Sequence, residues 1–520
     1  MKSPEETSDT EHPTPNIHGV RPTSPLRCWM LNVRCSVFPG LLVAGLSSFA
    51  ADPVPPPGTQ LVPYKPGVFR PDPVYPANSY DADEQLKIYG DKRAVPMSRP
   101  LIELGRELYR EGPFKPGMEF LGKKNLVFAN LLVSGDWRTA AAWNDTGATD
   151  FGVVATRLNL DVDLRITATE RVHAFFRPLD KNGEFTRVEF GRAKNREEFK
   201  LDGNPEALFF EGDLGAIGAG LTGRDSKFDL PFTFGLIPLI FQNGVWMEDA
   251  FIGGAFSIPA KNSALLDWSN FDLTFFAGFN KLTSPAFVDA GRLSDDHVQI
   301  FGAAAFVEAN QGYWEAGYAY LRDARDGKDA GYHNLALGFT RRYFDRVSNS
   351  IRVIGNAGQS AQPGGRTANG VLLLVENSLV TSLPSTLVPY ANFFAGFDRP
   401  QSAARDAGAG GVLKNTGILF ETDGLTGYPT LDSSANDTYG AAFGLQYLFN
   451  LDQQIVFEAA TVQVMGDDVG RIAHGAQYGV GIRYQRPLNH AWILRADAMM
   501  GWRENDTDIS GVRVELRLKF

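Results

Sequence analysis

The chain of 520 residues has only two cysteines, Cys28 and Cys35, and both precede an apolar segment that looks removable. After residue 50 no stretch reaches the roughly 18 apolar residues that a membrane-spanning helix needs. The nearest, Leu230–Phe241, contains two prolines. These absences exclude structural disulfides from the mature chain and exclude membrane helices. The net charge of −10 argues against a nucleic-acid partner.

Residues 1–50 are typical of a secretory signal peptide. Arg34 provides a basic start, Val37–Leu46 is apolar, and the small residues Ser48 and Ala50 precede a plausible cleavage site. The polar residues before Met30 lack a pattern, so Met30 is an alternative start of the protein. An exported chain without cysteine needs another source of stability, and a large closed sheet would supply it.

Residues 51–122 read as a Pro-rich periplasmic lead, because residues 51–80 offer too few packable side chains for a core. One short helix is predicted over residues 98–111, capped by Ser98 and ended by Gly112-Pro113, with a stripe of Leu101, Leu104 and Leu108. We expect this helix to be a plug or lid, or alternatively a surface for a partner.

From about residue 123 the apolar residues follow a two-residue period. The last ten residues, GVRVELRLKF, put Val512, Val514 and Leu516 on one face and charged residues on the other. Similar segments of about 10 residues, long enough for a tilted strand to cross a bilayer, occupy residues 157–168, 439–449, 476–486 and 492–503. Their apolar faces often end in Trp, Tyr or Phe, as at a membrane interface.

The connections between these segments alternate between short and long, from RENDTD and RPLN back to ANQG and KLTSPAFVDAGRLSDDH. A soluble β-sandwich, the alternative for the last strand, has no reason to sort its loops in this way, whereas a membrane barrel does. We therefore predict an all-β fold over residues 123–520. It is a transmembrane antiparallel up-and-down β-barrel of about 18 strands, with 16 possible because Arg177–Gly235 is hard to divide. Both barrel termini are expected on the periplasmic side.

With these features the chain resembles Gram-negative outer-membrane β-barrel porins. The resemblance implies an outer-membrane location and assembly by the barrel-assembly machinery, for which the terminal Phe520 would be the signal. A narrower similarity, to porins of the alginate-export type, rests on Phe232–Phe256, where glycines and Asp249 follow a strand-loop-strand pattern. That family usually has an arginine after the first glycine, where this chain has Leu236.

The charged residues at alternate strand positions are the candidate pore lining. They are expected to point into the barrel, because a charge at the lipid-facing midplane of the membrane costs about 2–4 kcal/mol. The last strands would form a basic wall that attracts anionic solutes. Alternatively, opposed charges simply neutralise each other. The candidates are Arg157, Asp161, Asp163, Arg165, Arg483, Arg495, Asp497, Arg503, Arg513, Glu515, Arg517 and Lys519.

No residue pattern indicates catalysis, a cofactor or a metal centre. The five histidines after residue 50 are scattered, and the turns at 180–184 and 504–508 are more typical of polar turns than of cation sites. We expect no enzyme, but a porin in the lipid bilayer that passes small hydrophilic solutes, with a preference for anionic solutes if the basic wall acts as proposed. The alternatives are a specific channel for an anionic oligosaccharide and a non-conducting barrel that scaffolds a periplasmic partner. A homo-oligomer stays possible. The connection from Arg399 to Asn436 could fold inward or lie on the surface.

Overall fold

The computed structural model describes residues 98–520, apart from 106–116, 182, 192–194, 285, 290–291, 294–296, 326–330, 361–364, 382, 384–385, 450–452 and 467–470. All described residues belong to one compact unit, which starts at Phe69. The predicted signal peptide and most of the predicted lead lie outside the described residues. No described helix is long and apolar enough to cross a membrane.

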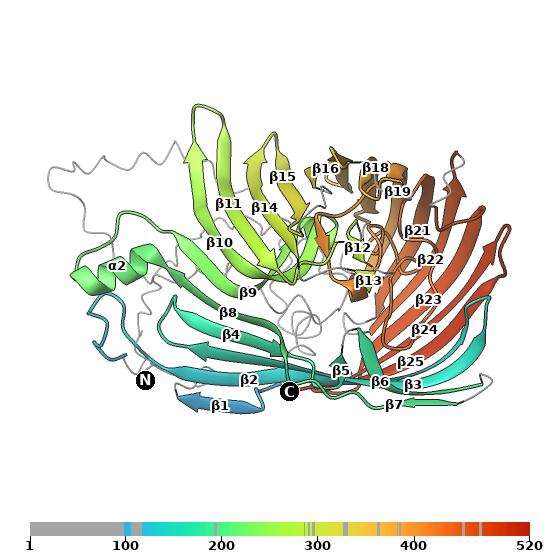
Figure 1. Ribbon diagram of the computed structural model, residues 1–520, viewed down its shortest axis with the longest axis horizontal. Helices are drawn as coiled ribbons and strands as arrows, with labels where there is room; N and C mark the ends of the chain where they lie inside the picture. Colours follow the sequence, from blue (N-terminus) through green and yellow to red (C-terminus); the bar gives the residue numbers. More distant parts are fainter. Residues whose placement is uncertain are drawn as a thin grey trace, which may run out of the picture. The chain divides into compact units, whose positions relative to one another are not determined.

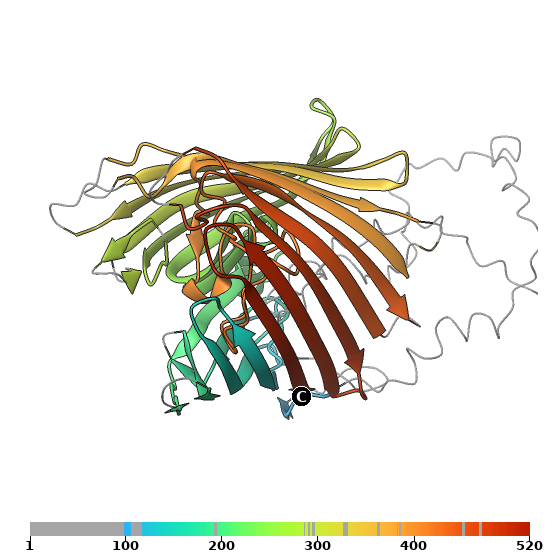
Figure 2. The same ribbon diagram turned by 90° about the vertical axis from the view of Figure 1, so that its right-hand side faces the viewer.

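An antiparallel wall of 18 strands closes into a barrel (Figures 1 and 2). Two of its strands are each built from two pieces, β4 with β6 and β7 with β8. The wall consists of β2 (Asn130–Asp145), β3 (Asp150–Arg165), β4 (Arg171–Phe176), β6 (Glu184–Phe190), β7 (Arg196–Glu198), β8 (Pro205–Asp213), β9 (Pro231–Phe241), β10 (Met247–Ser263), β11 (Trp268–Asn280), β14 (Val298–Ala309), β15 (Gly312–Asp323), β16 (Tyr332–Tyr343), β17 (Val347–Ala357), β18 (Asn369–Leu379), β19 (Leu387–Arg399), β21 (Thr438–Phe449), β22 (Gln453–Val464), β23 (Gln477–Pro487), β24 (Trp492–Arg503) and β25 (Ile509–Lys519).

The last strand closes the ring against the first. β25 pairs with β2 from Asp136↔Lys519 to Asp145↔Ser510. The carbonyl of Phe520 accepts a hydrogen bond from Gly135 N at 2.8 Å. Closure removes the exposed sheet edge that the alternating last strand would otherwise leave. The predicted barrel of 18 strands is confirmed, and the alternative of 16 is wrong.

The third and fourth strands are interrupted, which is why residues 177–235 were hard to divide from sequence. β4 pairs with the C-terminal half of β3, and β6 pairs with its N-terminal half. Between them, β5 (Asp180–Lys181) forms a small hairpin with the start of β6. Phe185 in this hairpin is buried in a cluster with Phe151, Val153 and Ala155 of β3. The interruption therefore fills the barrel interior with side chains and breaks the two-residue period.

Alternation along each regular strand separates an apolar outer face from a polar inner face. On β25, Val512 and Val514 are 56% and 49% exposed, whereas Arg513 and Glu515 are each 3% exposed. Leu335 and Leu337 on β16 show the same outward exposure, at 58% and 50%. An outer wall of exposed aliphatic and aromatic side chains suits hydrocarbon, and the charges lie where they avoid it.

The predicted helix over residues 98–111 is wrong for its described part. Ile102–Gly105 form a strand, β1, which pairs with β2 from Ile102↔Val133 to Gly105↔Asn130. β25 pairs with β2 only from Asp136 onward, so the first residues of β2 present a free edge. Backbone hydrogen bonds to that edge outweigh a weak local helix propensity. Residues 106–111 lie outside the described part of the chain.

The connections fall into two groups, as predicted. The end that holds both barrel termini has mostly short turns, such as 310–311 and 344–346, and the other end has the long links 281–297 and 400–437. An exception at the terminal end is α2 (Leu214–Thr222), a helix that the sequence analysis missed, capped by Asp213 and Gly223. The remaining short elements are β12 (Val288–Asp289), β13 (Arg292–Leu293), β20 (Ala404–Arg405) and the 3-10 turns η3 (Gln242–Gly244) and η4 (Ala407–Ala409).

Candidate functional site: an infolded loop and its arginine seat

The connection between β19 and β21, residues 400–437, folds into the barrel and is called the infolded loop here. Its first part reaches β10, where β20 pairs in parallel with Met247 and Glu248. Ala403 N also donates to Trp246 O at 2.7 Å. β10 lies seven strands from β19 around the ring. The loop therefore spans the interior, which decides between the inward and surface positions left open by the sequence.

Arg405 anchors this first part of the loop. Its side chain is 2% exposed and donates to the carbonyl oxygen of Val245 at 3.2 Å and to that of Gly244. The Glu248 carboxylate lies 3.9 Å from Arg405 and also pairs with Lys414 of the loop. A buried charge needs such partners, since its desolvation costs several kcal/mol.

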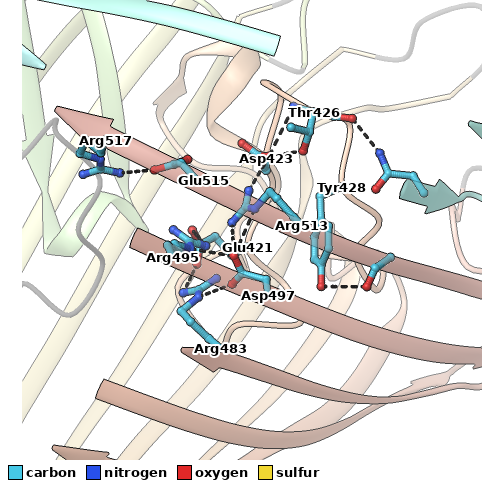
Figure 3. A network of polar contacts seen from close by, with 12 residues as sticks. Glu421, Asp423, Thr426, Tyr428, Arg483, Arg495, Asp497, Arg513, Glu515 and Arg517 are labelled. Carbon is cyan, nitrogen blue, oxygen red and sulfur yellow. Dashed lines mark hydrogen bonds and ion pairs between the residues drawn. The ribbon is translucent and has the colours of Figure 1, made fainter. Parts of the chain in front are cut away.

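The second part of the loop docks on the opposite wall through two carboxylates (Figure 3). Glu421 forms ion pairs with Arg483 at 2.6 Å and with Arg495 at 3.2 Å. Asp423 pairs with Arg513. The carbonyl of Thr426 also accepts a hydrogen bond from Asn144 of β2 at 2.8 Å.

Asp497 of β24 holds the same three arginines from the wall side. It accepts hydrogen bonds from Arg483 at 2.6 Å, Arg495 at 2.9 Å and Arg513 at 2.7 Å. These four residues of β23, β24 and β25 are called the arginine seat. Together with Glu421 and Asp423, three guanidinium groups face three carboxylates, so the closed assembly carries no net charge.

The electrostatics of the two loop acids follow from this arrangement. Burial alone would raise the pKa of Glu421, but Arg483, Arg495 and Arg513 overcome it and lower the pKa to about 2. Burial also opposes ionisation of Asp423, and the adjacent Arg513 lowers its pKa below the ordinary value. Both carboxylates are therefore ionised at neutral pH, as the seat requires.

Apolar packing reinforces the ion pairs. Leu419 packs closely against Gly481 of β23, where a Cβ atom would lie 2.9 Å from a leucine methyl group. Phe420 packs edge-on against Phe394 of β19 at 5.7 Å between ring centres. Each fully buried leucine contributes about 1.5–3 kcal/mol. The buried apolar side chains of the loop include Val412, Leu413, Leu419, Phe420, Leu425 and Leu431.

The other predicted residues of the last strands lie beside the seat. Arg517 donates to Glu515 at 3.0 Å and lies 3.6 Å from Asp136. Arg503, at the end of β24, donates to carbonyl oxygens of the neighbouring turns at Thr507 and Thr146. Lys519 pairs in register with Asp136 at the terminal end of the barrel.

The predicted residues of β3 point inward as a separate group. Arg157 pairs with Asp180 at 2.9 Å, and Asp163 lies between Arg165 at 4.0 Å and Arg171 at 3.6 Å. Asp161 has no ion pair among the described residues. Among the described residues, those of the turns 180–184 and 504–508 included, no cluster of His, Cys, Asp or Glu could hold a metal ion.

Sequence reasoning missed Glu421 and Asp423, although they pair with three arginines of the predicted basic wall. The only indication in the sequence was that the long connection contains acidic residues while the last strands have an excess of inward-pointing arginines. Nothing in the periodicity of that connection places them against particular strands.

The closed barrel, its apolar outer face and its charged interior define the class as a transmembrane β-barrel with an infolded loop. By sequence, no family model and no curated protein matches the chain.

Solved structures with a similar fold include Pseudomonas aeruginosa OccK11 (OpdR), at 10% identity and a TM-score of 0.47 over 75% of this chain and 96% of that one. OccK5 (OpdH) of the same organism shares 10% identity, with a TM-score of 0.48 over 75% and 98%. Wzi of Escherichia coli, described as an outer-membrane protein of capsule assembly and a carbohydrate-binding β-barrel, shares 12% identity, with a TM-score of 0.44 over 74% and 85%.

Proposed function

We propose that the chain is an outer-membrane channel for passive diffusion of small hydrophilic solutes, narrowed by the infolded loop. The main support for this proposal is the closed wall of 18 strands, whose outer face is apolar and whose inner face is charged. A barrel of this strand number is wide enough to enclose an aqueous passage. The terminal Phe520 and the expected signal peptide support assembly into the outer membrane.

The infolded loop gives the proposed channel its constriction. It contacts β10 at one side of the interior and β23–β25 at the other. A solute would pass beside the loop, so the loop would set the size limit. The proposed channel is therefore a wide barrel whose interior is crossed by the infolded loop, and it is not an open cylinder.

A preference of the channel for anions would depend on charged residues outside the arginine seat. Glu421, Asp423 and Asp497 together neutralise Arg483, Arg495 and Arg513, so these three arginines would attract anions only if the loop left its position. We therefore propose weak selectivity while the loop is seated. A dedicated route for an anionic oligosaccharide would need the arginines to be exposed by loop movement.

Single-channel conductance of the detergent-folded protein, measured in a planar bilayer under a KCl gradient, tests the proposal. Steady open steps with a small reversal potential are expected. Silence from protein shown to be folded would contradict it. Replacing Arg495, Arg513 and Arg517 with Glu is a poor test of selectivity alone, because two of these arginines also hold the loop.

A second candidate, a non-conducting barrel that scaffolds a partner, is favoured by one observation: the loop touches both sides of the interior. Under this alternative the loop is a plug. Shortening the loop would then convert a silent protein into a conducting one, whereas the channel proposal expects conduction from both forms.

A further inference from the structure

A second interior site lies on the wall that faces the arginine seat. The turn between β9 and β10 bends inward, and beside it is a cavity of about 60 Å³. Gln242 and Trp246 of the turn line it together with Asp272 of β11 and Glu315 of β15. Phe241 and Phe306 add aromatic walls.

Most of the polar groups around this cavity are hydrogen-bond acceptors: the carboxylates of Asp272 and Glu315 and the side-chain carbonyl of Gln242. Among the described residues, Asp272 and Glu315 form no ion pair. Gln242 is 5% exposed, and its Oε1 atom is buried without a hydrogen-bond partner in the described structure. The hydroxyl of Thr274, which also lines the cavity, is already bonded to Ser257 at 2.8 Å. A buried acceptor without a donor is unfavourable, so a ligand N–H group would stabilise Gln242 Oε1, and further N–H groups of the ligand would bond to the two carboxylates.

The carboxylates of this wall outnumber the cation beside them. Arg352 of β17 forms an ion pair with Glu376 of β18. Glu315 lies beside the same arginine, because a Cβ atom on Gly338 would lie 3.4 Å from the side chain of Arg352 and 3.6 Å from that of Glu315. The single guanidinium group of Arg352 therefore faces more than one carboxylate in the region of Asp272, Glu315 and Glu376. In the arginine seat, by contrast, cations and anions match in number.

Aromatic rings complete the site. Trp246 is fully buried, with Phe241 at 5.6 Å and Phe276 at 6.2 Å between ring centres. Its indole nitrogen donates to Asn334 at 2.8 Å, which fixes the ring over Gly317 of β15. Aromatic walls beside carboxylates favour cations, because the negative face of a ring attracts positive charge.

We propose that this cavity binds a small organic cation with a guanidinium or ammonium head group. Asp272 and Glu315 would accept its charged N–H groups, and Gln242 Oε1 would accept a further one. An engineered cavity of about 150 Å³ holds benzene, so about 60 Å³ suits a head group with few heavy atoms. The site is independent of conduction, because it requires only the folded barrel.

Calorimetric titration of the detergent-folded full chain with methylguanidinium tests this proposal, with methylurea as the neutral probe of nearly the same shape. We expect methylguanidinium to bind with a dissociation constant of about 1 mM and methylurea to bind at least about tenfold more weakly. Equal binding of the two probes would mean a pocket for neutral polar ligands and would overturn the proposal. Absence of methylguanidinium binding would overturn it as well.

The variants Asp272→Asn and Glu315→Gln should each weaken methylguanidinium binding about tenfold, the effect of losing one charged hydrogen-bond acceptor. Asp161→Asn is the matched control, because Asp161 is an inward carboxylate of β3 without an ion pair and outside this cavity. Its binding should equal that of the unaltered chain. Equal binding by all three variants, with each shown to be folded by its electrophoretic mobility without heating, would contradict the assignment.

Discussion

Two facing parts of the barrel wall carry charge in opposite ways. On β23–β25, the buried Arg483, Arg495 and Arg513 are each paired with carboxylates of the wall and of the infolded loop. On β11–β15, nine strands away around the ring, Asp272 and Glu315 lie beside a cavity without a described ion pair. An inward charge thus has a structural role where its partners are built in. It becomes available to a ligand where they are absent.

The two regions also differ in rigidity and in access for a ligand: the seat holds the loop in place, and the facing wall has a cavity. Opposed charges, tight glycine contacts and buried leucines hold the loop against its seat. On the facing wall, Gln242, Asp272 and Glu315 surround unfilled space. We therefore expect changes in the seat to alter stability and conductance, and changes in the facing wall to alter ligand binding alone.

The largest effect is expected from Asp497→Ala. Three guanidinium groups would lose their shared acceptor, and breaking a buried ion pair costs about 3–5 kcal/mol. Denaturant unfolding of the variant should show a loss of stability of that size. Glu504→Ala, on the neighbouring turn, is the control and should stay within about 0.5 kcal/mol of the unaltered chain. Equal stability of the two variants would show that the seat is not a stabilising cluster.

The next effect is expected from the double variant Glu421→Gln, Asp423→Asn. It removes both loop charges from the seat, so the loop should leave it and the three arginines should become exposed. We expect single-channel conductance to rise roughly twofold or more and the reversal potential to shift toward chloride. Unchanged conductance and selectivity would mean that apolar packing alone holds the loop.

A smaller effect is expected from acid. The pKa of Glu421 in the folded chain is about 2, below its ordinary value of 4.5, so its ionisation stabilises the seated loop. That contribution is complete above about pH 4.5 and is lost as the pH falls toward 2. Conductance should therefore stay constant from pH 7 to 4.5 and rise only below it. A rise between pH 7 and 5 would contradict the depressed pKa.

The smallest effect is expected from Lys519→Glu. Lys519 is half-buried at the terminal end of the barrel and has no described ion pair. Its reversal should shift the reversal potential slightly toward potassium without changing stability, because long-range surface charge is screened by salt. A shift as large as that of the loop double variant would place the selectivity at the barrel mouth.

Much of the fold could be predicted from the sequence, because each regular strand carries its own two-residue signal. Residues 511–520 alone indicated a strand with one lipid-facing side and one charged side. The signal failed where strands are interrupted, as at Asp180–Phe185, since those residues leave the wall to fill the interior. It also failed at Ile102–Gly105, where a free edge of β2 decides the conformation.

The candidate site could be predicted only in part. The inward arginines were identified from parity, but their partners Glu421 and Asp423 lie some 60–90 residues earlier in an irregular loop. The cavity at Asp272 and Glu315 depends on the inward bend of Gln242–Trp246, which no periodic pattern encodes. The two-residue alternation predicts whether a side chain points into the barrel or toward the lipid. It does not predict which residues of a loop the side chain contacts.

The most direct test of the central claim compares single-channel conductance of the full chain with that of a chain in which residues 411–431 are replaced by a short Gly-Ser linker. The account predicts steady open steps from both forms, with the larger conductance from the shortened loop. Equal conductance would contradict an infolded constriction, and silence from the full chain with conduction from the shortened one would make the loop a plug.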